Sequence, residues 1–106
     1  MNIEDLTLKQ IREIAGMASD NSAWKIGENY LIRTVTMIDT GRLVAVTNHE
    51  LVLEDAAWIA DTGRFSQAVA SAEFGEVEPF PAGQVIIGRG SVIDAVRIKS
   101  LPRIQK

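Results

Sequence analysis

The chain has 106 residues, 46% of them hydrophobic, which is enough apolar material for a single domain with its own core. It contains no cysteine and one histidine, His49, so a disulfide framework, a thiolate metal site, a cysteine nucleophile and a multi-histidine zinc site are excluded. The net charge of −3 argues against a protein that binds phosphate over its whole surface, although a local basic patch remains compatible with it.

The first residues do not resemble a leader or a membrane anchor. Met1–Gln10 is acidic and polar where a signal peptide would be basic and then apolar, and no run approaches the roughly eighteen apolar residues of a membrane span. We therefore expect a soluble and, by default, cytoplasmic protein that does not contact membranes.

A helix is predicted from about Thr7 to Ala18, within an N-terminal unit of residues 1–22. Thr7 and Gln10 have the spacing of a capping box, in which each side chain bonds the backbone N–H of the other residue. The polar face carries charges of both signs, which favours docking on the rest of the domain over membrane binding. The apolar face consists of Leu8, Ile11, Ile14, Ala15 and Ala18.

Three antiparallel strands are predicted within residues 30–59, at 30–37, 42–47 and 50–59. The region is rich in valine, isoleucine and leucine, and Asp39–Gly41 and Thr47–His49 carry residues that favour turns. The middle strand should therefore pair on both sides. Trp24 is expected to close one end of the core.

Residues 60–83 form a predicted insertion. Its first part, residues 64–72, has helical spacing with Phe65, Val69 and Ala70 on one side. Its second part, residues 73–83, should be a loop or an edge segment, because prolines cannot serve a central ladder.

Two further strands are predicted at 84–88 and 91–98, separated by a bend at Gly88–Gly90, and a basic tail follows at 99–106. Charge is unevenly distributed. Glu50–Glu78 contains seven acidic residues and one arginine, whereas Arg89–Lys106 contains five basic residues and one aspartate. In an oligomer, the acidic insertion of one subunit could lie against the basic tail of the next. Most of the core is predicted to come from Leu31, Val35, Leu43, Val46, Leu51, Leu53, Ile87, Ile93 and Val96.

No catalytic residue, cofactor or metal ligand is predicted. Arg89, between two glycines, could bind a base or phosphate, or could donate to carbonyls of a neighbouring subunit. His49 has no Ser, Cys or Asp partner that the sequence implies, which favours an exposed turn residue over a general base. Glu54 and Asp55 are consecutive strand residues, so their side chains should point to opposite faces and should not converge on one substrate.

Two stretches together resemble the Sm and Sm-like family, including its bacterial host-factor members. Arg89–Val96 is similar to the second motif, Arg-Gly-x-x-apolar-x-x-apolar, and Leu31–Ala57, with its Leu-Val-Leu-Glu-Asp-Ala run, is similar to the first. The resemblance implies an N-terminal helix followed by a small, strongly bent five-stranded antiparallel barrel. It further implies that the fourth and fifth strands pair edge to edge between subunits in a ring, with an interface at Val85, Ile86, Ile87, Ser91 and Ile93.

The resemblance also implies where RNA or another partner would bind, namely at Thr47, Asn48, His49, Glu50, Arg89 and Gly90. Family members that bind RNA carry Asp and Asn where Thr47 and Glu50 stand here, so RNA binding should be weak and centred on Arg89. The run Leu51–Phe65 is in addition similar to small proteins of tailed phages, which implies a phage gene and a location in the host cytoplasm or the virion.

Three classes of function remain open on the sequence. The first is a non-enzymatic, ring-forming structural or interaction protein, which could be part of a phage particle or of its assembly and whose partners are its own copies and other phage proteins. The second is an RNA-binding Sm-like ring. An enzyme is the third and has least support, because no convergent catalytic set is evident.

Overall fold

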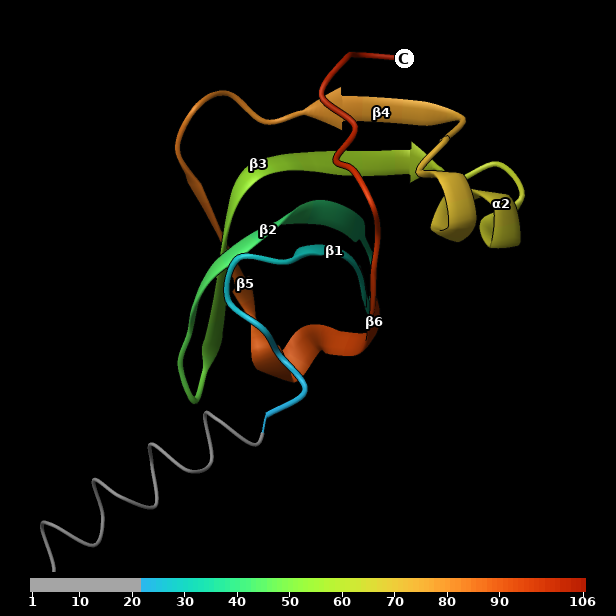
Figure 1. Cartoon of the computed structure of the whole chain (residues 1–106). Coiled ribbons are helices and arrows are strands. Elements are labelled where there is room, and N and C mark those ends of the chain that lie inside the picture. The colour runs from blue at the N-terminus through green and yellow to red at the C-terminus, as the bar shows by residue number, and fades with distance from the viewer. Residues whose placement is uncertain (1–21) are drawn as a thin grey trace, which may run out of the picture.

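The structure of the chain is a computed structural model, and it describes residues 22–106 (Figure 1). The predicted helix at 7–18 lies outside these residues. The described part is mainly β, with one six-stranded antiparallel sheet and one α-helix. The elements are β1 (Asn29–Thr34), β2 (Ile38–Val46), β3 (Glu50–Asp61), α2 (Phe65–Ser71), β4 (Glu76–Pro79), β5 (Gln84–Gly88), the 3₁₀ helix η1 (Arg89–Ser91) and β6 (Val92–Arg97).

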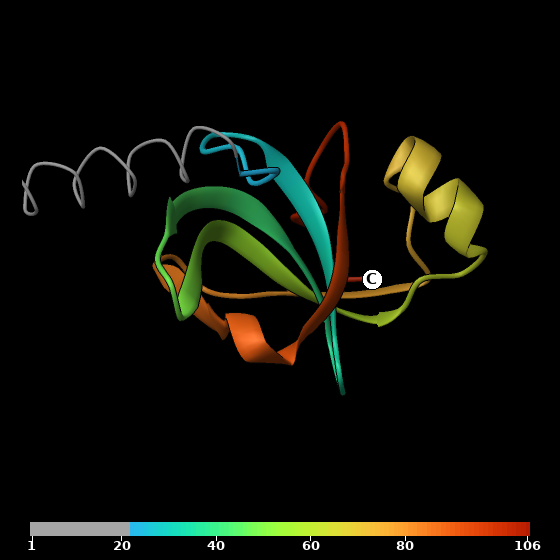
Figure 2. The same ribbon diagram turned by 90° about the horizontal axis from the view of Figure 1, so that it is seen from below.

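The sheet has the order β4-β3-β2-β1-β6, and β5 pairs separately with β3. The long strand β3 changes partners along its length: Glu50–Glu54 pairs with β5, and Ala57–Asp61 pairs with β4. The middle strand β2 is paired on both sides, as predicted. The sheet curls around its core (Figure 2), but β5 pairs only with β3 and β6 only with β1 among the described residues. The predicted closed barrel is therefore an open, curled sheet within this chain.

The first predicted turn is wrong, because Asp39–Gly41 lies inside β2. The turn is instead at residues 35–37, where Thr34 and Met37 are joined by backbone and side-chain hydrogen bonds of 2.8–3.0 Å. Gly41 is needed in the strand for close packing, since a Cβ atom there would lie 2.8 Å from the Cβ of Leu53. The second predicted turn, Thr47–His49, is confirmed as the link between β2 and β3.

A bulge in β3 bends the strand where it changes partners. Asp55 has a φ of +51°, and the β2–β3 register shifts between Thr40 and Arg42. The expectation that Glu54 and Asp55 point apart is therefore wrong, because the Arg42 guanidinium reaches both carboxylates, at 3.9 and 2.7 Å. An extra residue in one strand disrupts the alternation of side chains locally.

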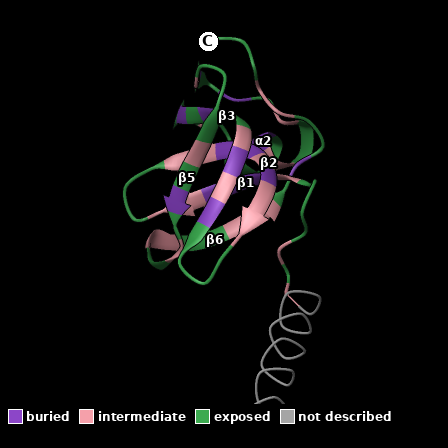
Figure 3. Cartoon of the chain, turned by 90° about the vertical axis from the view of Figure 1, so that its left-hand side faces the viewer, coloured by how far each residue is buried: buried purple, intermediate pink, exposed green. Residues whose placement is uncertain are grey.

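Side chains pack on both faces of the sheet, so β1 buries three consecutive residues, Tyr30, Leu31 and Ile32. Figure 3 shows buried positions among intermediate ones along the central strands. The inner face of the curl holds Tyr30, Ile32, Leu43, Leu51, Leu53, Ala56 and Ile87, with Trp24 packed at its margin. The outer face, toward α2 and the C-terminal residues, holds Leu31, Ala57, Ile59, Ala68, Phe74, Val77 and Ile98.

Of the predicted core, Leu31, Leu43, Leu51, Leu53 and Ile87 are buried, and Val46 and Val96 are partly buried. The prediction of Val35 and Ile93 as core residues is wrong, because 72% and 64% of their surfaces are exposed. Val35 is exposed because it lies in the turn. Ile93 is the extra residue of a bulge in β6, where Arg33 pairs with Asp94 and Thr34 with Val92.

The insertion contains the predicted helix, α2, and an edge strand, β4. The helix buries Ala68, whereas Phe65, Val69 and Ala70 were predicted to form its apolar face. The buried face is therefore not the predicted one. The C-terminal residues return along β4, where the backbone groups of Val77 and Lys106 bond each other at 3.0 Å in both directions. The basic tail thus lies against the acidic insertion of its own chain. Within residues 22–106, no helix has the length and hydropathy needed to cross a membrane.

Candidate functional site

Arg89 and the Thr47–Glu50 turn, which the Sm-like resemblance implies as a binding site, lie together. The Arg89 backbone N–H donates to the His49 carbonyl at 2.8 Å, and its guanidinium Nη1 donates to the Thr47 carbonyl at 2.6 Å. Gly90 follows in η1, and Asn48 and Glu50 are exposed in or beside the turn. Arg89 therefore donates to a carbonyl of its own chain. On the sequence alone, a carbonyl of a neighbouring subunit was an equally open partner.

The turn offers little chemistry beyond its shape. The Thr47 hydroxyl already accepts the N–H groups of His49 and Glu50, at 3.2 and 3.0 Å. His49 is exposed, and no side-chain hydrogen bond joins it to a nucleophile or a carboxylate within the described part of the chain. Across residues 22–106, no group of three or more acidic or imidazole side chains has the arrangement of a metal site.

The predicted oligomer interface lies on β5, η1 and the start of β6, and its residues differ in exposure. Ile87 is buried and belongs to the inner core, and Val85 packs partly against that core. Ile86 and Ile93 present 61% and 64% of their surfaces to the outside, and the Ser91 hydroxyl donates to the Gly88 carbonyl at 2.7 Å. Ile86, Ile93 and the strand edges are thus the parts available to a partner.

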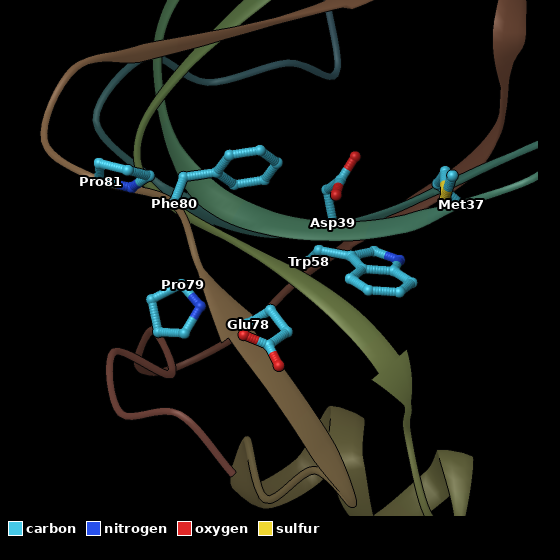
Figure 4. A pocket seen from close by; sticks show the side chains of 7 residues that line it. All are labelled: Met37, Asp39, Trp58, Glu78, Pro79, Phe80 and Pro81. Carbon is cyan, nitrogen blue, oxygen red and sulfur yellow. The ribbon is translucent and has the colours of Figure 1, made fainter.

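The structure also contains a groove that the sequence did not predict (Figure 4). Cross-strand pairing puts Ile32, Asp39, Trp58 and Glu78 in one row on one face of β1–β4. Ile32 is buried under the curl, but the sheet beyond it is open, and a groove of about 380 Å³ lies there. Its lining consists of Met37, Asp39, Trp58, Glu78, Pro79, Phe80 and Pro81.

Asp39 is the half-buried charge of the groove. Burial raises the pKa of its carboxyl above the ordinary value, and no hydrogen bond contributes to that shift. Trp58, its cross-strand neighbour, keeps 38% of its surface exposed. The groove could not be predicted from the sequence as long as Asp39 was expected in a turn. With β2 starting at Ile38, the alternation along β2 and β3 would have put Asp39 and Trp58 on one face.

Comparison with known families, with curated proteins and with solved structures finds no match to this chain. The resemblance to Sm-like and tailed-phage proteins thus stays a prediction.

Proposed function

We propose that this chain is a non-enzymatic structural or interaction protein that assembles with copies of itself through the edges of β5 and β6. The observation that carries the proposal is the edge of β5. One side of β5 pairs with β3, and no strand of residues 22–106 covers the other side. Gln84–Gly88 contains no charged residue and no proline, which are the usual protection of an exposed edge.

The edge of β6 is the natural complement. It pairs with β1 on one side only. Its exposed residue Ile93 would supply an apolar contact, as the exposed Ile86 would on β5. Pairing β5 of one copy with β6 of the next is a head-to-tail contact, which forms a ring when the rotation closes. This arrangement would continue the curled sheet from subunit to subunit, as the Sm-like resemblance implies, and a role in phage particles or their assembly fits it.

RNA binding by such a ring is the second candidate, and one observation favours it. The structure brings Arg89 against the Thr47–Glu50 turn, the juxtaposition that the family uses around a base. Against it, Arg89 already donates to Thr47, and Glu50 adds a negative charge beside any approaching phosphate. A labelled oligo-uridine tests this candidate: tight binding at moderate salt that is lost in Arg89→Ala would favour RNA as the ligand.

Sedimentation velocity on the wild type and an edge variant tests self-assembly. We expect an oligomer at micromolar concentration and a folded monomer for Ile86→Lys, because a lysine on the edge opposes pairing. Ile86→Pro is a second variant. The hydrogen bond from the Arg89 N–H to the His49 carbonyl fixes which residues of β5 bond to β3. The backbone N–H of Val85 then points toward β3 and that of Ile86 points away from it. Proline at 86 therefore removes only an outward-pointing donor.

Ile26→Lys is the matched control, because Ile26 is also 60% exposed but lies outside both edges. The control should sediment as the wild type does. A monomeric wild type, or an Ile86→Lys variant with unchanged assembly, would refute the proposal.

A further inference from the structure

The groove beside Trp58 has a lining of one charge sign. Among the described residues that line it, Asp39 and Glu78 are ionisable and the others are apolar or aromatic. Phe80 and Pro81 lie at one end and Met37 at the other, with Asp39 and Trp58 between them (Figure 4). Such a groove complements a ligand that is apolar along its length and positively charged near its middle.

Two features favour a cation at the centre. The exposed indole of Trp58 attracts cations through its π face, and the interaction is strongest for tryptophan among the aromatic residues. Asp39 pairs with Trp58 across the strands, and the half-buried Asp39 carboxylate has lost solvation without gaining a hydrogen bond. A guanidinium or ammonium between the two side chains would restore that lost interaction.

We propose that this groove binds a segment of a partner protein in which an arginine or lysine lies beside an apolar residue. The cation lies between Asp39 and the Trp58 ring, and the apolar neighbours cover Met37 and Phe80. Two carboxylates repel phosphate, which disfavours a nucleic acid. The extent of the groove from Met37 to Pro81 suits a peptide better than a small cation.

This site is separate from the proposed assembly edges, since no residue of β5 or β6 lines it. The chain's own tail borders the groove without lining it, and the Gln105 side-chain amide donates to the Glu78 carboxylate at 3.3 Å. Arg103 donates to the carbonyls of Ala56 and Phe80, at 2.6 and 3.2 Å, and Lys106 pairs with Val77. Within the part of the chain that the structure describes, no residue of the tail occupies the groove.

The test is an NMR titration of the full chain, read at the indole N–H of Trp58. The probes are two end-capped tripeptides, Leu-Arg-Leu and Leu-norleucine-Leu. We expect the arginine peptide to shift the Trp58 signal with an affinity about tenfold higher than the norleucine peptide, which corresponds to about 1.4 kcal/mol. Trp58→Phe assigns the signal against that of Trp24.

Asp39→Asn should remove the difference between the two peptides, whereas Glu73→Gln, the same loss of charge at an exposed residue outside the groove, should preserve it. Three outcomes would each overturn the proposal. The two peptides could bind equally, or the Trp58 signal could stay unshifted at millimolar peptide. The third is a Trp58 signal that shifts with protein concentration but not with added peptide. Repeating the titration on Ile86→Lys keeps the result independent of self-assembly.

Discussion

At the scale of single residues, Gly41 lets β2 pass close to β3. A Cβ atom there would lie 2.8 Å from the Cβ and 2.9 Å from the Cδ1 of Leu53, which is itself fully buried. Gly41→Ala should therefore lower the free energy of unfolding by about 1–3 kcal/mol, because the strands must separate to accept the methyl group.

Urea unfolding measures this effect, with Gly90→Ala as the control. Gly90 has open space around its Cα and lacks a positive φ, so alanine there should change stability by no more than about 0.5 kcal/mol. Equal stability of Gly41→Ala and the wild type would show that β2 and β3 are less closely packed than described.

Asp39 and Asp94 should respond to pH with opposite signs. Burial raises the pKa of Asp39 in the folded state, so the folded chain holds this proton more tightly and Asp39 costs stability once pH exceeds its folded pKa. Asp39→Asn should therefore raise the Tm at pH 7. The difference should vanish below the ordinary carboxyl pKa.

The hydrogen bond from Arg33, helped by its charge, lowers the pKa of Asp94. Asp94 thus contributes stability above the unfolded pKa, and this contribution is lost as pH falls through the folded pKa. Asp94→Asn should lower the Tm at pH 7. Thermal melts of both variants from pH 3 to pH 8 check the two signs, and a lower Tm for Asp39→Asn at pH 7 would contradict the account of the groove.

At the scale of elements, a bulge decides which residues of a strand reach the core. Leu53 is fully buried where β3 pairs with β5 without a register shift, whereas Ile93, similar in size, is pushed outward by the bulge of β6. Leu53→Ala should cost about 2–5 kcal/mol. Ile93→Ala should change stability by no more than about 0.5 kcal/mol, because little surface is lost from the core.

Chemical denaturation of the two alanine variants, monitored by far-UV circular dichroism, separates these cases. A loss of stability in Ile93→Ala comparable to that in Leu53→Ala would mean that Ile93 is buried, in the core or against another copy. Repeating the Ile93→Ala measurement in the Ile86→Lys background distinguishes burial in the core from burial against another copy. The stability loss should disappear there only if Ile93 is buried against another copy.

The strands themselves could be predicted because β-branched residues crowd them, and four of the five predicted strands differ from the observed ones by one to four residues at their ends. Their details could not. Asp39–Gly41 has the composition of a turn, but the close approach of Leu53 and the hydrogen bonds of Thr34 with Met37 move the turn to residues 35–37. The edge strand β4, anticipated only as a loop or edge segment, depends on distant pairing with β3.

The same limit applies to the sites. The Sm-like resemblance placed Arg89 and the turn at Thr47 in one candidate site, and the structure brings them into contact. The groove depends instead on the register of β2 against β3, because a slip of one residue would move Asp39 to the opposite face from Trp58. Residues that converge through register, such as Asp39 and Trp58, are therefore the ones that composition and spacing miss.

At the scale of the whole molecule, Arg103 ties the tail to the place where β3 leaves the curl. Its guanidinium donates to the carbonyl of Ala56, just after the bulge, and to that of Phe80, just after β4. Arg103→Ala should lower the Tm by a few degrees, and Arg103→Lys should not restore it, because an ammonium lacks the planar fork that reaches two carbonyls.

Arg97→Ala is the control, since Arg97 is exposed and makes no side-chain hydrogen bond or ion pair within residues 22–106. Differential scanning calorimetry compares the three variants. Full recovery with lysine would indicate that charge near Asp55 matters more than the two hydrogen bonds.

The pairing of β1 with β6 joins the first and last strands of the sheet, with Tyr30 opposite Arg97. A ribosome releases residues 29–34 long before residues 92–97, so the side of β1 that pairs with β6 stays unpaired until residues 92–97 have emerged. Contacts between such distant residues are slow to form, because a long loop must close first. During synthesis, one edge of the strand Asn29–Thr34 is therefore exposed that the finished fold covers. A chaperone that binds unpaired strands could act on it in this interval.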